Sequence, residues 1–332
     1  MVEVGKNSVI KTIVSEEEQG QRLDNYLLRV CKGVPRSHLY QIVRSGEVRV
    51  NSGRVAVSYR LRSGDILRIP PLRMAERKSE RENEIIDGAA IKAELPILFE
   101  DEALLAIDKP AGIAVHGGSG VSFGVIEALR RQRPQARFLE LAHRLDRETS
   151  GVLLVGKKRS ALNALHDLFR SGGRSGGAVD KRYWVLVVGR WMDPLRNVRL
   201  PLLKYDLPSG EKRVRVADEG KASHTVFRLL ARWKGFSLLE AELKTGRTHQ
   251  IRVHLAHLGY PIAGDEKYGD FARNRELQRD GLKRMFLHAR SMRLPHPASG
   301  ETLELESSLP TALASFLQHL SQHDAQDYGQ TF

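Results

Sequence analysis

Cysteine is almost absent from this chain of 332 residues, in which Cys31 is the single one. An internal disulfide is therefore excluded, and no cysteine or histidine stands near Cys31 at the spacing of zinc ligands. Chains without disulfides are typical of a reducing compartment, so we expect a cytoplasmic protein.

Long apolar runs are missing as well. No stretch approaches the roughly 18 apolar residues of a membrane span. The opening MVEVGKNSVIKTIV lacks the apolar core of a signal peptide, so we expect no signal peptide. From both observations we expect no membrane partner. Nucleotide-binding fingerprints are also absent, because the glycines of HGGSG (residues 116–120) follow neither the Walker nor the dinucleotide spacing. That loop can cradle a phosphate or serve as a flexible turn.

Positive charge is what the chain has in excess. It carries 53 lysines and arginines against 40 aspartates and glutamates, a net charge of +13 at pH 7. Such an excess points to a polyanionic partner, most often nucleic acid. The length suits roughly two domains, and a hydrophobic content of 41% is enough for a sizeable core.

The first part of the chain reads as a small helical unit with a short sheet. Apolar residues recur at helical spacing over residues 23–30 and 39–43, and Ser37 is a candidate cap for the second helix. Apolar and polar residues alternate over 48–51 and 65–69, which predicts short strands.

Basic side chains surround this small unit. Arg22, Arg36 and Arg44 are the candidate contacts for a phosphate backbone. The plainer interpretation of such charges is a solvated surface, but here they agree with the charge of the whole chain.

Composition also suggests the boundaries of the domains. We expect a tail over residues 1–20, with a short strand at 9–14, and a small basic domain over 21–82. A charged linker over 83–94 would lead to a larger domain over 95–325.

The stretch HRLDRETSG, residues 143–151, places Asp146 between Arg144 and Arg147, just before a buried strand at 152–155. Neighbouring cations favour an ionised carboxylate, which can act as a nucleophile or base without a metal. A structural turn with an Asp146–Arg147 ion pair is the plainer interpretation, and pattern alone favours it.

Two later segments carry further candidates. Tyr183 stands near the start of a buried strand over 181–189, where a tyrosine is ordinarily part of the core. In TGRTHQIRVHLAHLG, residues 245–259, Thr248 is a candidate helix cap, and Arg247 precedes it with a side chain free to reach elsewhere.

Histidines are frequent in this second segment, at 249, 254 and 257, and they suggest a metal site. No cysteine is near them and the H-E-x-x-H pattern is absent, so we expect no metal.

The small unit resembles the S4 RNA-binding domain through RLDNYLLRV, VPRSHLYQIVRSGEVRVNSGRV and GDILRIP. The larger domain resembles the RluA-type pseudouridine synthases through HRLDRETSG, KRYWVLVVG and LKTGRTHQIRVHL, in that order. DKPAGIAVHGGSG and FLHA fit the same family. The resemblance implies an α+β fold: a two-helix S4 domain with a short sheet, joined to a mixed, mainly antiparallel sheet with flanking helices.

The resemblance also implies an activity and a substrate. A pseudouridine synthase isomerises uridine in RNA, and the reaction requires no cofactor and no metal. We expect a monomer that acts on large-subunit (23S) ribosomal RNA, free or in a particle that precedes the large subunit.

Site residues follow from the resemblance by position. Asp146 is the expected catalytic aspartate, which attacks C1′ of the sugar or C6 of the base, or assists a glycal. Tyr183 is expected to pack under the uracil, and Arg247 to pair with the aspartate and hold the flipped nucleotide. Arg144 is expected to fill the gap left in the RNA stack, and Ile251 to line the pocket.

Two departures and two alternatives remain. Trp184 is larger than the residue usual after the family tyrosine, and the loop GGRSGG (residues 172–177) is extended. A non-catalytic S4-type RNA-binding or ribosome-assembly factor would have the same composition. A metal-dependent phosphodiesterase is disfavoured, because this chain lacks the clustered carboxylates that such a site needs.

Overall fold

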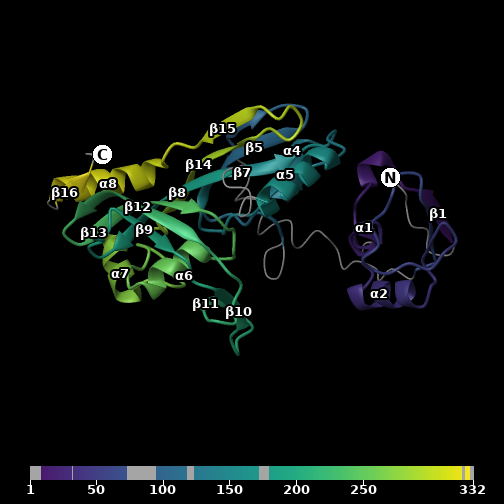
Figure 1. Cartoon of the computed structure of the whole chain (residues 1–332), viewed down its shortest axis with the longest axis horizontal. Helices are drawn as coiled ribbons and strands as arrows, with labels where there is room; N and C mark the ends of the chain where they lie inside the picture. Colours follow the sequence, from purple (N-terminus) through teal and green to yellow (C-terminus); the bar gives the residue numbers. More distant parts are fainter. Residues whose placement is uncertain are drawn as a thin grey trace. The chain divides into compact units, whose positions relative to one another are not determined.

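The structure is a computed structural model that describes residues 9–31, 33–72, 95–117, 123–171, 179–323 and 326–329. The chain divides into two compact units, residues 1–92 and 93–332, each with its own sheet (Figure 1). The predicted linker over 83–94 lies outside the described residues. No helix in the described part of the chain is long and apolar enough to cross a membrane.

The first unit packs two helices on a three-stranded antiparallel sheet with the order β1-β3-β2. Its core consists of aliphatic side chains from both helices and the sheet, among them Leu23, Leu39 and Leu67, which are almost completely buried. The elements are β1 Ile10–Ile13, the 3-10 helix η1 Glu16–Glu18, α1 Leu23–Val30, α2 Arg36–Arg44, β2 Arg49–Val50 and β3 Ile66–Ile69.

Two predictions for this unit were wrong. The strand expected at 9–14 is present as β1, but it does not belong to a tail, because it pairs with β3 along its whole length, from Ile10↔Ile69 to Ile13↔Ile66. The second helix begins one residue before its predicted cap, because the carbonyl of Pro35 accepts the first helical hydrogen bonds and leaves Ser37 in the first turn.

The second unit is built on an eleven-stranded sheet whose main path runs β16-β12-β13-β8-β14-β7-β5-β4. β15 pairs with β14, β6 with β7 and β9 with β12, and among these pairs only β14 and β7 run parallel. Its strands are β4 Ile97–Glu100, β5 Leu104–Lys109, β6 Glu140–Leu141, β7 Ser150–Gly156, β8 Asp180–Val188, β9 Leu195–Val198, β12 Thr225–Trp233, β13 Phe236–Leu243, β14 Leu287–Pro295, β15 Thr302–Glu306 and β16 Gln326–Gly329. β16 extends this domain past the predicted end at 325.

Helices and a separate hairpin accompany this sheet (Figure 1). The helices are α4 Val125–Gln132, α5 Arg159–Ser171, α6 Gln250–His257, α7 Phe271–Arg279 and α8 Thr311–His323. The hairpin, β10 Leu202–Asp206 and β11 Lys212–Val216, is a two-stranded sheet of its own that packs on α6. The predicted α+β class is confirmed, although the sequence patterns predicted neither α7 nor the hairpin.

The parallel pair of β14 and β7 brings two strand backbones very close together. Every residue of β7 is buried, which its run of valine and leucine indicated. Gly151 pairs with Ala289 at a φ of +108°, and a Cβ at that position would lie 2.2 Å from the carbonyl oxygen of Ala289. This strand position therefore requires glycine both for its backbone angle and for the close approach of β14.

We predict that Gly151→Ala lowers the free energy of unfolding of the second unit by at least about 2 kcal/mol, because strain and a backbone clash add. Gly300→Ala is the matched control, since Gly300 has a φ of +77° and a methyl group added there would meet no atom within 4 Å. It should lose roughly 1 kcal/mol. Urea unfolding measures both, and equal losses would contradict the steric argument.

Candidate active site

The loop that carries Asp146 is tied to the loop after β5 by a buried lysine. The ammonium of Lys109 donates to the carbonyl oxygens of Pro110 and Ile113, both at 2.8 Å, and of Arg147 at 3.1 Å. The amide of Gly112 also donates to the Arg147 carbonyl, at 2.8 Å. These bonds fix the backbone one residue after Asp146, so the carboxylate stands on a held turn rather than on a free loop.

Burial lowers the pKa of Lys109 to about 7, and the cation of Arg284 acts in the same direction, whereas the charges of Glu148 and Asp146 oppose it. The unfolded chain then holds this proton at pH values where the folded protein releases it. We predict that the stability of the wild type, relative to Lys109→Met, rises between about pH 7 and pH 10. Urea unfolding of both proteins at pH 6, 8 and 9.5 tests this, and a difference that does not change with pH would refute it.

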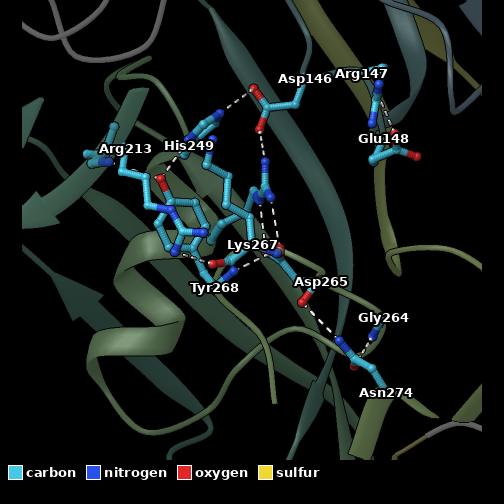
Figure 2. A network of polar contacts seen from close by, with 12 residues as sticks. Asp146, Arg147, Glu148, Arg213, His249, Gly264, Asp265, Lys267, Tyr268 and Asn274 are labelled. Carbon is cyan, nitrogen blue, oxygen red and sulfur yellow. Dashed lines mark hydrogen bonds and ion pairs between the residues drawn. The ribbon is translucent and has the colours of Figure 1, made fainter. Parts of the chain in front are cut away.

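The carboxylate of Asp146 pairs with an arginine from α6. Nη1 of Arg252 lies 2.9 Å from Oδ2 of Asp146. The other edge of the same guanidinium binds Asp265, with Nε and Nη2 each 2.8 Å from a carboxylate oxygen. Figure 2 shows both carboxylates, Asp146 and Asp265, with dashed lines that mark their contacts. The plainer interpretation of Asp146 as the ion-pair partner of Arg147 was wrong, because Arg147 pairs with Glu148 at 2.7 Å.

Arg247 does not make the contact that was expected of it. Its Nε donates to the carbonyl of Ala222 at 3.1 Å, and its side chain is exposed, while the arginine that holds Asp146 stands five residues later. The reason is where α6 begins. The helix starts at Gln250, so Arg247 lies on the turn before it and Arg252 lies in the buried first turn.

The prediction that Thr248 caps this helix was also wrong. The residue that precedes α6 is His249, which has a left-handed backbone with a φ of +53° and makes no capping hydrogen bond through its side chain. Residues 250–255 of α6 are all buried. A helix that is buried on every side gives no periodicity from which the inward position of Arg252 could be read.

Charges inside this site stabilise one another. Burial by itself lowers the pKa of Arg252, but the hydrogen bonds and charge of Asp265, together with those of Asp146, outweigh burial and raise it. Burial by itself raises the pKa of Asp265, and Arg252 with the backbone amides of Lys267 and Tyr268 brings it below its ordinary value. Both groups are therefore charged at neutral pH.

The strand order brings Tyr183 near enough to the Asp146 loop for the charge of the carboxylate to act on its phenol. Ala289 on β14 pairs with Gly151 on one side and with Tyr183 of β8 on the other. Burial raises the pKa of the Tyr183 phenol, and the negative charge of Asp146 raises it further. The structure thus brings together Asp146 and Tyr183, which the sequence analysis had taken from distant motifs.

The other predicted residues of this domain lie on the same elements. Ile251 is buried on α6, next to Arg252. Arg144 is exposed two residues before Asp146. Sequence reasoning missed Arg252 although it stands inside a quoted motif. It also missed Asp265, because an aspartate in a glycine-flanked turn is too weak a signal to indicate a site residue.

The predicted RNA contacts of the first unit are partly engaged within the protein. Arg22 binds the buried carboxylate of Asp24 at 2.8 and 3.0 Å, and this bond lowers the pKa of Asp24 to about 2 despite its burial. The hydroxyl of Tyr40 donates to the same carboxylate and accepts from Arg36, each within 2.9 Å. Arg44 is exposed at the end of α2. Their contact with RNA stays a prediction.

His254 of α6 has a structural role, and His249, just before the helix, faces Asp146. His254 is buried between the hydroxyls of Ser223 and Thr225, at 2.8 and 3.0 Å. Across the part of the chain that the structure describes, no group of three or more histidine, cysteine or acidic residues could hold a metal ion. Residues 118–120 of the glycine-rich loop and the segment 172–177 lie outside that part.

Comparison with known proteins places this site in a family. The profile described as RNA pseudouridylate synthase matches residues 103–257, and the profile described as S4 domain matches residues 21–67. The chain is that of an enzyme that makes pseudouridine in RNA, and it belongs to the RNA pseudouridine synthase family.

Relatives that are similar along nearly the whole chain have a common name, ribosomal large subunit pseudouridine synthase C. The protein from Haemophilus influenzae is 50% identical, over 95% of this chain and 97% of its own. That from Escherichia coli K12 is 49% identical, over 94% and 97%. The solved structure of human RNA pseudouridylate synthase domain containing 4 is 26% identical, with a TM-score of 0.57 over 76% of this chain and all of its own.

Proposed function

We propose that this enzyme isomerises specific uridines in large-subunit (23S) ribosomal RNA to pseudouridine, with Asp146 as the catalytic carboxylate acting on a flipped-out nucleotide. The observation that carries the proposal is the ion pair of Asp146 with Arg252 beside the phenol of Tyr183. The rRNA substrate is supported by relatives named for the ribosomal large subunit at 49–50% identity.

The reaction breaks the bond between N1 and C1′, turns the base, and joins C5 to C1′. Substrate and product have the same atoms and oxidation state, so the protein has to supply a nucleophile or base, a place for the turning base and a path for one proton. Oδ2 of Asp146 accepts a hydrogen bond from Arg252. Oδ1 is then the oxygen that meets C1′ or C6 of the nucleotide or assists formation of a glycal.

The remaining residues of the site would hold the nucleotide. Tyr183, whose phenol stays protonated, offers a ring face for the uracil, and Ile251 offers an apolar wall. Arg247 is exposed beside α6, where its remaining N–H groups suit a phosphate rather than the aspartate. Arg144, two residues before Asp146, is placed to enter the gap that the extruded base leaves in the stack.

Extruding a base from folded RNA costs a few kcal/mol, and backbone contacts elsewhere can offset that cost. The S4 unit and the charge of +13 suit this purpose. We propose the rRNA or a particle that precedes the large subunit as the partner, a monomer as the working form, and the cytoplasm as the place of action.

We predict that pseudouridines lost from the rRNA of a deletion strain return with the wild-type gene and not with Asp146→Asn. The amide keeps the size of the side chain but removes the charge that the chemistry requires. Chemical mapping of pseudouridine across the rRNA measures this. Binding of the variant to transcribed 23S rRNA should stay within a few-fold of the wild type.

Full modification by the Asp146→Asn variant would overturn the role of Asp146. The alternative, a non-catalytic S4-type assembly factor, predicts a different result: growth and ribosome profiles of the deletion strain would be rescued equally by both genes, with the pseudouridine pattern unchanged by the deletion.

The two arginines of the α6 segment should behave differently. Arg252→Gln is predicted to lower the single-turnover rate by at least about 100-fold and to destabilise the protein, because it leaves two carboxylates without their cation. Arg247→Gln should mainly weaken RNA binding, by roughly tenfold, with unchanged stability. Rate, RNA affinity and urea unfolding separate the two, and a larger rate loss for Arg247→Gln would contradict the assignment.

A further inference from the structure

Two side chains connect the β10–β11 hairpin with the carboxylate of Asp146. The hydroxyl of Tyr268 accepts the amide N–H of Val214 in β11 at 3.0 Å and lies 2.8 Å from Nδ1 of His249. Nε2 of His249 lies 3.8 Å from Oδ1 of Asp146. Figure 2 shows His249 between Tyr268 and Asp146. The resting site thus gives each carboxylate oxygen of Asp146 a different neighbour, Arg252 at Oδ2 and His249 at Oδ1.

The hydrogen-bond pattern favours one tautomer of His249. A phenol has one proton to donate, and the amide of Val214 already occupies an acceptor position on the Tyr268 oxygen. In the tautomer that makes use of the phenol proton, Nδ1 of His249 accepts it, at 2.8 Å. A neutral imidazole that accepts at Nδ1 carries its own proton at Nε2, the nitrogen that faces Asp146.

Both partners are neutral. Burial lowers the pKa of His249 to about 4, the charges of Arg252 and Lys267 lower it too, and those of Asp146 and Asp265 oppose them. Burial raises the pKa of the Tyr268 phenol to about 12. The imidazole therefore meets Asp146 as a neutral N–H donor and not as a second cation.

The backbone of His249 is held in a conformation that residues other than glycine rarely adopt. Its φ of +53° is left-handed, and the side chain does not cap α6, which it immediately precedes. Such strained positions persist where the surroundings over-determine them, and they concentrate at functional sites. The conformation turns the imidazole away from the helix end and toward Tyr268 and Asp146.

We propose that His249 is a positioning residue for Asp146, kept by Tyr268 in the tautomer with its proton on Nε2. Together with Arg252, it restricts rotation of the carboxylate, so that Oδ1, which has two lone pairs, accepts from His249 and meets the nucleotide in every turnover. The gap of 3.8 Å shortens to a hydrogen bond when RNA is bound, as catalytic contacts commonly do. The proposal rests on the catalytic role of Asp146.

The tautomer can be measured without any reaction. Long-range ¹H–¹⁵N spectra of the full chain, with His249→Gln to identify the signals, should show His249 protonated at Nε2 near pH 7. In Tyr268→Phe, which keeps the ring but removes the hydroxyl, this signature should change to a mixture of tautomers. A proton on Nδ1 in the wild type, or spectra that Tyr268→Phe does not alter, would overturn the proposal.

Two substitutions of His249 then separate positioning from structural support. The amide nitrogen of Gln reaches about as far as Nε2 and keeps a donor toward Asp146, whereas Asn reaches only as far as Nδ1 but tolerates a left-handed backbone better. We expect His249→Gln to retain a single-turnover rate on transcribed 23S rRNA within a few-fold of the wild type, and His249→Asn to lose about tenfold. Thermal stability should follow the opposite order.

A purely structural role predicts that the rate follows stability, with the Asn variant the faster, and this result would also overturn the proposal. If the wild type itself does not modify 23S rRNA, the proposed substrate is wrong, and the tautomer measurement still decides the state of His249. Failure of the inference and failure of the proposed function are thus distinguishable.

Discussion

The site depends on one buried guanidinium between two carboxylates. Arg252 is 8% exposed and Asp265 is 1% exposed, so neither charge could be kept there alone. Removing one partner of such a group leaves an uncompensated charge, typically at a cost of about 3–5 kcal/mol. Asp265 is itself held by the amides of Lys267 and Tyr268. The cation offered to Asp146 therefore has a fixed position before any RNA arrives.

The sheet brings the remaining parts to this cation. Ala289 on β14 pairs with Gly151 on one side and with Tyr183 on the other. The strand that follows the Asp146 loop and the strand that carries the tyrosine are therefore separated only by β14. The parallel β14–β7 pair is possible only because Gly151 lets the two backbones approach closely. The geometry of the site thus depends on the close packing of β14 against β7.

The hairpin is attached to the same segment that holds Arg252. Its strand β11 donates to Tyr268, and Lys267 binds the carbonyl of Lys212 at 2.8 Å. Residues 265–268 therefore contact the hairpin, His249 and the central arginine at once. A short turn between two glycines connects three parts of the site through the polar groups of Asp265, Lys267 and Tyr268.

The sequence alone determined the class of the fold, the two-part organisation, the buried strands β7 and β8, and the candidacy of Asp146 and Tyr183. Periodicity and charge are local signals, and they were sufficient for the strands and the two-part organisation. The class of the fold and the catalytic candidacy of Asp146 and Tyr183 came from the resemblance of whole motifs. The tertiary structure decided which arginine meets Asp146. Arg247 and Arg252 are chemically alike and five residues apart, and only the start of α6 at Gln250 turns one outward and buries the other. The tertiary structure also decided the role of Asp265, because an ion pair between separate elements leaves no pattern in the sequence of either segment.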